Sequence, residues 1–266
     1  MASRTKQKEE ARARRLAEER ARAEKSRRDR RLRMVGGVVV LAIAIAAVLV
    51  AVSSGSSPNS LEKGLLKGNQ RNAAVTTVDN LLNGVPQSGA TLGNPNAPVT
   101  MDYYGDLECP ICQEFTLQGG LSQLIANEVR QGKVKIVYKA FETATRDPSV
   151  FEDQQVAALA AGMQKKFWNY AELFYHEQGQ EDTGYVTESY LDNLAQQTTG
   201  MNLVKWESDR NNPSLTTQVI DDVNQGNSIG VTGTPTLVFI GPKGKAAAPE
   251  SVPSYSQLQQ VIKQVS

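Results

Sequence analysis

The sequence predicts a mixed α/β domain that follows a single transmembrane helix. Three observations lead to this prediction. A run of 19 uncharged residues, Met34–Val52, is long enough to cross a bilayer as a helix. Residues 99–104 and 134–141 have the pattern of strands, and the helical pattern between them favours a parallel pair with a crossover helix. A long helical stretch then covers residues 148–212.

Charge is divided unevenly along the chain. Residues 1–33 hold 14 Lys/Arg and 6 Asp/Glu, whereas the remaining residues hold 15 Lys/Arg and 22 Asp/Glu. Arginines beside an apolar span resist translocation, so Arg30, Arg31 and Arg33 predict that residues 1–33 form a basic cytoplasmic tail. The body of the chain, after Ser53, is then expected outside the cytoplasm. No aromatic residue or binding motif interrupts the tail, and we expect no nucleic-acid partner.

A cleaved signal peptide is the alternative reading of the apolar run. Ala51-Val52-Ser53 is an acceptable small-residue cleavage site, but a signal peptide normally has a much shorter charged leader than the 33 residues found here. A lipoprotein is excluded, because no cysteine directly follows the run; the two cysteines are Cys109 and Cys112. We therefore expect an uncleaved single-pass anchor.

The expected order is a tail at 1–33, a transmembrane helix at 34–52, a linker at 53–83 and a folded domain at 84–266. Within the linker, residues 61–82 allow one or two short helices. Apolar spacing predicts one helix over 111–130, ended by Gly132, and an inserted helical layer at about 148–212 whose aromatic residues form its core. Further elements are expected as a helix at 214–228, a strand at 236–240, a weak return strand at 245–248 and a helix at 255–265.

Cys109-Pro110-Ile111-Cys112 is the strongest chemical signal in the chain. A structural zinc site needs four ligands, and the only histidine, His176, is remote in sequence, so no metal is expected. The pair follows a strand and opens a helix, where free N–H groups and the helix dipole stabilise a thiolate. Cys109 is expected at the helix cap with its sulfur exposed, and Cys112 one turn deeper. Cys109 then forms the mixed disulfide and Cys112 resolves it.

A second motif, Val231-Thr232-Gly233-Thr234-Pro235-Thr236, leads into the late strand. Together with the dithiol, Asn94-Pro95-Asn96-Ala97-Pro98-Val99, Gly105-Asp106-Leu107-Glu108 and Lys166-Phe167-Trp168, it resembles the DsbA-like branch of the thioredoxin superfamily. The resemblance runs from about Gly93 to the C-terminus. It implies a thioredoxin-like fold with a helical insertion.

The resemblance also implies site residues. Pro235 is expected to be cis and to face the dithiol, and the backbone of Thr234 to pair with an extended substrate segment next to Pro110 and Ile111. Many relatives use an acid that assists proton transfer; Asp102, Asp106 and Glu108 are alternatives for it, or are cap and surface residues. The chain departs from the best-known oxidants at Ile111, where they have histidine, and this removes one hydrogen bond to the thiolate.

The expected function is that of an enzyme that introduces disulfides into secreted or cell-envelope proteins. Its partners are then thiol-containing substrate proteins and, by the resemblance, a quinone-linked membrane oxidase that recharges it. Alternatives are an anchored reductase or isomerase, because the motif does not set the direction of exchange, or a non-catalytic binding module. We expect no cofactor, no catalytic base at His176, and a monomer.

Overall fold

The computed structural model describes residues 65–249 and 251–266. The expected transmembrane helix at 34–52 lies outside these residues, and no helix within them is long and apolar enough to cross a membrane. The helices are α2 (Asn69–Leu82), α3 (Pro110–Leu117), α4 (Leu121–Leu124), the π-helical turn η1 (Ile125–Val129), α5 (Pro148–Gly162), α6 (Phe167–His176), α7 (Glu188–Gln197), α8 (Leu203–Asp209), α9 (Pro213–Ser228) and α10 (Tyr255–Val265).

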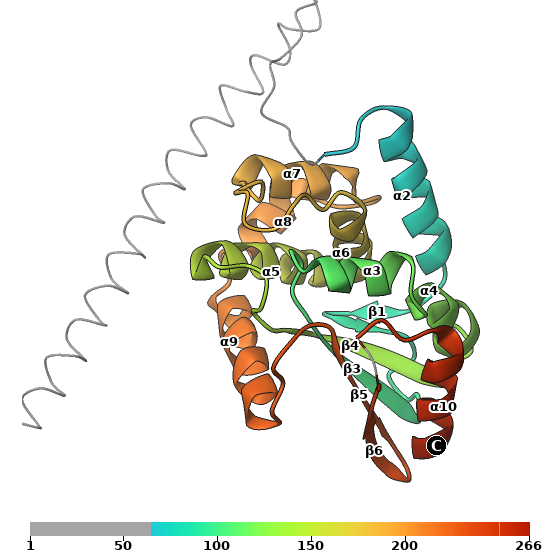
Figure 1. The fold of residues 1–266 in the computed structure, drawn as a ribbon. Coiled ribbons are helices and arrows are strands. Elements are labelled where there is room, and N and C mark those ends of the chain that lie inside the picture. Colours follow the sequence, from blue (N-terminus) through green and yellow to red (C-terminus); the bar gives the residue numbers. More distant parts are fainter. Residues whose placement is uncertain (1–64, 250) are drawn as a thin grey trace, which may run out of the picture. The chain divides into compact units, whose positions relative to one another are not determined.

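The strands form one mixed sheet in the order β1-β2-β4-β3-β5-β6 (Figure 1). Its members are β1 (Gln87–Ser88), β2 (Thr91–Leu92), β3 (Val99–Gly105), β4 (Val134–Ala140), β5 (Thr236–Gly241) and β6 (Gly244–Ala247). The expected parallel pair with a crossover helix is confirmed, since β3 and β4 are parallel and α3, α4 and η1 connect them. The short hairpin β1–β2, which pairs with β4, is not among the elements that the sequence predicts.

The two faces of the sheet are covered by different helices. Alternate side chains of β3 point to opposite faces, so Met101 and Tyr103 face the main core while Asp102 and Tyr104 face the other way. Helix α9 covers the second face, where a Cβ on Gly226 would come within 3.3 Å of the Tyr104 ring. Helices α10 and α4 lie on the opposite side of the strands from α9 (Figure 1).

The helix expected over residues 111–130 is interrupted. Helix α3 ends at Leu117, and the chain turns at Gly119 and Gly120 before α4 begins. A Cβ on Gly120 would lie 2.7 Å from the backbone nitrogen of Tyr255, so the close approach of α10 requires glycine here. The apolar period survives this break, which explains why the sequence pattern alone predicts one continuous helix.

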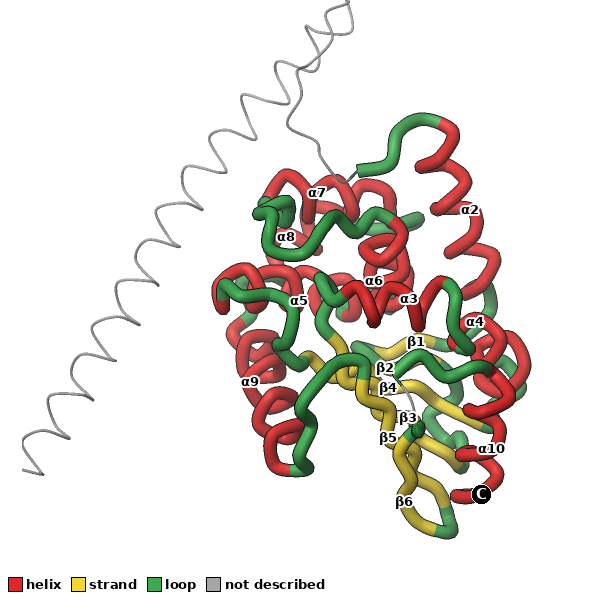
Figure 2. Tube along the Cα trace, in the orientation of Figure 1, coloured by secondary structure: helices red, strands yellow, loops and turns green. Residues whose placement is uncertain are grey.

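The helical insertion consists of α5, α6, α7 and α8, with α9 leading back to the sheet. The stretch 148–212 is not wholly helical, because residues 177–187 form an irregular loop between α6 and α7. The expected aromatic core is confirmed by Phe167, Trp168, Phe174 and Tyr190, all of which are buried. Helix α6 packs against α3 on the dithiol side and also against α2 (Figure 2).

Helix α2 belongs to the folded body. Its residues Ala74, Val78 and Leu82 are buried in the main core, and Gln87 of β1, which follows α2, donates a hydrogen bond to Asn169 of α6. The folded body therefore extends further toward the N-terminus than its expected start at Gly84. Little in the sequence indicates this, because α2 is polar on most of its surface.

Candidate functional site

The topology of the sheet brings the two sequence motifs together. Strand β5 is antiparallel to β3, and Thr236 at its start pairs with Tyr104 near the end of β3. The segment after β3, which holds the dithiol, therefore lies beside the segment before β5, which holds Thr234 and Pro235. The sulfur of Cys109 lies 3.3 Å from the carbonyl oxygen of Thr234, to which Cys109 donates a hydrogen bond when it is protonated.

The dithiol opens helix α3 as the sequence predicts. Cys109 is the N-cap residue with extended backbone angles, and Pro110 occupies the first helical position, where its missing N–H costs no hydrogen bond. Both cysteines are free thiols. The expectation of an exposed Cys109 sulfur is wrong: Cys109 is 5% exposed and Cys112 is fully buried. Cys109 is covered because the segment around Thr234 closes over it, a long-range contact that local sequence does not reveal.

The two thiols differ in acidity. A hydrogen bond from the Cys112 thiol is the largest cause that lowers the pKa of Cys109 to about 6, and burial partly opposes it. The Thr234 side chain and the backbone N–H groups of Cys112 and Ile111 lower this pKa further. Burial raises the pKa of Cys112 well above its usual value. At neutral pH Cys109 is therefore a thiolate and Cys112 a thiol, which suits them to attack and resolution respectively.

Asp106 holds the loop before the dithiol in place. Its carboxylate is fully buried and accepts hydrogen bonds from the backbone N–H groups of Glu108, Thr143, Ala144 and Thr145 and from the Thr145 hydroxyl. These bonds join the loop after β3 to the loop after β4. Because these donors occupy the carboxylate oxygens, Asp106 is better explained as a residue that stabilises the loop than as a proton carrier.

The other two candidate acids occupy different surroundings. Asp102 lies on the α9 face of the sheet, away from Tyr103 and the dithiol, and burial raises its pKa. Burial also raises the pKa of Glu108 to about 7, opposed by a hydrogen bond with Thr145. Glu108 directly precedes Cys109, and a negative charge there would disfavour the thiolate, but Glu108 is not among the main groups that set the pKa of Cys109.

Several residues at the site carry no signal in the sequence. Beneath Cys112, the buried hydroxyl of Tyr103 lies 3.5 Å from the Cys112 carbonyl oxygen and 3.4 Å from the hydroxyls of Thr116 and Tyr175. The hydroxyl of Thr143 forms a hydrogen bond with that of Thr234. These contacts connect residues far apart in the chain, and no motif marks them.

Two glutamines join the start of α3 to the end of α6. Gln113 donates to the carbonyl oxygen of Tyr175 at 2.7 Å. Gln178 donates to the carbonyl oxygens of Leu107 at 2.6 Å and Cys109 at 3.2 Å. The dithiol therefore rests on the helical insertion as well as on the sheet. Neither glutamine carries a sequence signal that distinguishes it from the other glutamines of this polar chain.

The Thr234–Pro235 peptide is cis, as the resemblance implies. A dithiol at a helix N-terminus thus faces a cis-proline loop, the arrangement expected from the two sequence motifs. A family model described as thioredoxin matches residues 86–264, about two thirds of the chain. The chain belongs to the thioredoxin family.

Two curated proteins share sequence with this chain. The chain is 23% identical over 157 residues to the probable disulfide bond formation protein D of Bacillus anthracis, covering 57% of this chain and 69% of that protein. It is 28% identical over 159 residues to the Na(+)/H(+) antiporter NhaA 1 of Mycolicibacterium gilvum, covering 59% of this chain. The match spans only 24% of the antiporter's length.

Solved structures of the thioredoxin family share the fold. Oxidised BdbD from Bacillus subtilis superposes with a TM-score of 0.57 at 20% identity, covering 67% of this chain and 97% of that chain. The α-DsbA1 protein from Wolbachia pipientis superposes with a TM-score of 0.54 at 16% identity, covering 69% of this chain and 92% of that chain. At these identities the likeness establishes the fold alone, and the function is inferred from the geometry of the site.

Two other residues considered in the sequence, Ile111 and His176, can now be placed. Ile111 is 40% exposed beside the dithiol. Burial lowers the pKa of His176, which lies at the end of α6.

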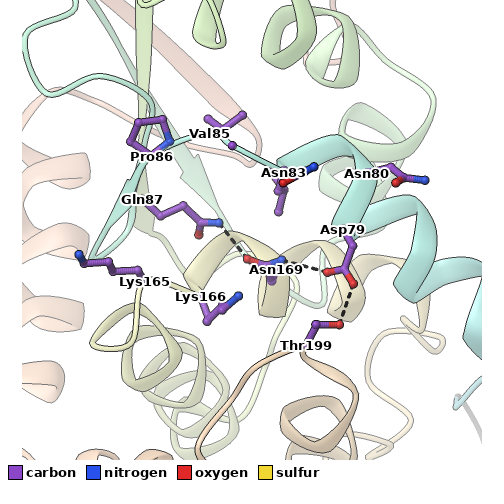
Figure 3. A pocket seen from close by; sticks show the side chains of 12 residues that line it. Asp79, Asn80, Asn83, Val85, Pro86, Gln87, Lys165, Lys166, Asn169 and Thr199 are labelled. Carbon is purple, nitrogen blue, oxygen red and sulfur yellow. Dashed lines mark hydrogen bonds between the residues drawn. The ribbon is translucent and has the colours of Figure 1, made fainter.

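A polar cavity of about 650 Å³ lies between α2 and the start of α6, where Gln87, Asn169, Asp79 and Thr199 form a chain of hydrogen bonds (Figure 3). None of the residues lining it belongs to the dithiol loops.

Proposed function

We propose that the protein is an oxidase that introduces disulfides into secreted or cell-envelope proteins through Cys109 and Cys112. The observation that carries this proposal is the asymmetry of the two thiols. The Cys109 thiolate is stabilised by the Cys112 thiol, Thr234 and the N-terminus of α3, whereas Cys112 is held as a buried thiol. Stabilising the reduced form makes the disulfide a stronger oxidant.

The exchange balances with two substrate thiols. A substrate thiolate attacks the Cys109 sulfur of the enzyme disulfide, the bond between Cys109 and Cys112 breaks, and Cys112 leaves and takes up a proton. A second substrate thiolate then attacks the substrate sulfur of the mixed disulfide. Cys109 leaves as a thiolate, the form favoured by its pKa of about 6. The substrate has lost two electrons and the enzyme dithiol has gained them.

In this proposal the substrate lies against the segment that covers Cys109. The backbone of Thr234, next to Pro235, is the pairing partner of an extended substrate chain, and Pro110 and Ile111 form the adjacent surface. Ile111 is among the exposed large apolar side chains of the described part of the chain, which supports a contact with substrate. The thiol-containing client is thereby held with its sulfur in line with Cys109.

A single measurement distinguishes the oxidase from the alternative of a reductase or isomerase. The equilibrium potential of the Cys109–Cys112 couple in a glutathione buffer is expected between about −270 mV, typical of a reductant, and about −120 mV, typical of a strong oxidant. A value at or below the reductant's would favour the alternative. The lack of a hydrogen-bond donor on the Ile111 side chain is the feature that favours this alternative, because a less stable thiolate makes a weaker oxidant.

We further propose that Met34–Val52 anchors the protein in the membrane with the catalytic domain outside the cytoplasm. The apolar length and the flanking arginines support this orientation, and an oxidising compartment suits disulfide formation. A quinone-linked membrane oxidase is the proposed recharging partner. Protease added to intact spheroplasts should digest the domain and spare the tail at residues 1–33; digestion of the tail alone would contradict the orientation.

A further inference from the structure

The peptide between Cys109 and Pro110 has few ways to be held in place. Proline has no backbone N–H, so this peptide can be fixed by hydrogen bonds only through the carbonyl oxygen of Cys109. That oxygen accepts the backbone N–H of Gln113 at 3.1 Å, the first bond of α3, and the side-chain amide of Gln178 at 3.2 Å. Gln178 is thus the side chain that fixes the orientation of the reactive residue's own peptide.

The same amide also holds the peptide before Glu108. Gln178 donates to the carbonyl oxygen of Leu107 at 2.6 Å, while the N–H of that peptide, on Glu108, donates to the carboxylate of Asp106 at 3.0 Å. The Leu107–Glu108 peptide and the Cys109–Pro110 peptide are therefore both held by the side chain of Gln178, which lies in the loop after α6. This loop is itself anchored, because the Tyr190 hydroxyl donates to the carbonyl oxygen of Glu177 at 3.1 Å.

We propose that Gln178 is a positioning residue for thiol–disulfide exchange: its amide directs the Cys109 sulfur toward the N–H groups that open α3. Two physical effects act in the same direction. The bond restricts rotation of the Cys109 peptide, and so keeps the sulfur near the backbone N–H groups of Ile111 and Cys112. The amide N–H also offsets the negative ends of two carbonyl groups close to the thiolate. The inference needs exchange at Cys109 but does not depend on its direction or on the cellular address.

Two substitutions separate hydrogen bonding from packing. Gln178→Met keeps the length of the side chain and removes its N–H donors. Gln178→Lys keeps a donor and adds a positive charge. The matched control is Gln180→Met, an exposed glutamine in the same loop. Each reduced variant is titrated by thiolate absorbance to obtain the Cys109 pKa, its equilibrium potential is measured in a glutathione buffer, and its urea midpoint reports folding.

The expected shifts have opposite signs. Gln178→Met raises the Cys109 pKa by about half a unit or more and makes the couple less oxidising, because the thiolate loses stabilisation. Gln178→Lys lowers the pKa below that of the wild type, and Gln180→Met changes neither quantity. If Gln178→Met lowers only the urea midpoint while the pKa and potential stay at wild-type values, Gln178 is a loop anchor and the proposal fails. Should Gln178→Met not fold, an unchanged or raised pKa in Gln178→Lys overturns the proposal equally.

Discussion

The sulfur of Cys109 lies 3.3 Å from the carbonyl oxygen of Thr234, although 125 positions separate the two residues in the chain. This contact explains why Cys109 is only 5% exposed while it remains the more accessible thiol of the pair. It also places the backbone atom that would pair with a substrate directly beside the sulfur that the substrate thiolate would attack. Thiol reactivity and substrate binding are therefore coupled at this one point.

The two cysteines should be alkylated at different rates in the reduced protein. Cys109, with a pKa of about 6, should react first, and its rate should fall about tenfold for each pH unit below that value as the thiolate is protonated. Cys112 should stay unlabelled, because it is buried and its pKa is raised. Mass spectrometry of peptides after brief labelling measures both. Preferential labelling of Cys112 would reverse the assigned roles.

Substitution of Cys112 should both trap substrates and weaken the thiolate. Cys112→Ala removes the resolving thiol, so mixed disulfides between Cys109 and client proteins should accumulate as high-mass bands that vanish with reductant. It also removes the largest contribution that lowers the Cys109 pKa, which should therefore rise. Cys112→Ser keeps a hydroxyl donor and should raise this pKa less. Equal pKa values in the two variants would argue against a hydrogen bond from residue 112.

Ile111→His should make the protein a stronger oxidant. A histidine at this exposed position can donate a hydrogen bond to the Cys109 thiolate, which isoleucine cannot, so the Cys109 pKa should fall. The potential should rise, with about 30 mV corresponding to about 1.4 kcal/mol for a two-electron couple. Ile220→His, at a similarly exposed isoleucine on α9, is the control. A lower pKa with an unchanged or lower potential would show that thiolate stability does not govern this couple.

Glu172 should make the stability of the domain depend on pH. It lies on α6, is 2% exposed, and its Oε1 atom has no hydrogen-bond partner among the described residues. Burial raises its pKa to about 8, so the folded protein keeps a proton that the unfolded chain loses above about pH 4.5. Stability should therefore fall as pH rises from about 4.5 to about 8.

Glu172→Gln removes this titration. The variant should match the wild type near pH 4.5 and exceed its free energy of unfolding by on the order of 4 kcal/mol near pH 8. Urea unfolding at several pH values measures the difference, with Asp221→Asn, an exposed carboxylate on α9, as control. A constant difference between Glu172→Gln and the wild type across this range would mean that Glu172 is charged in the folded protein or does not influence its stability.

The amino-acid sequence by itself determined much of the fold and the reactive pair. Periodicity placed β3, β4, β5, α9 and α10 within a residue or two, because each has a continuous apolar pattern. Cys109, Pro110 and Cys112 could be assigned to a helix N-terminus because capping is local. The motif that ends in Thr236 likewise pointed to Pro235, whose cis peptide the structure confirms.

Only the tertiary structure decided how the reactive pair is surrounded. Contacts between distant segments bury Cys109 and bind Asp106 to the loop after β4. They also place Asp102 on the α9 face and join Gln178 to the carbonyl oxygen of Cys109. The break at Gly120 and the inclusion of α2 in the body have the same origin. A local pattern indicates which face of an element is apolar. Tertiary packing decides which element covers that face and which polar groups meet there.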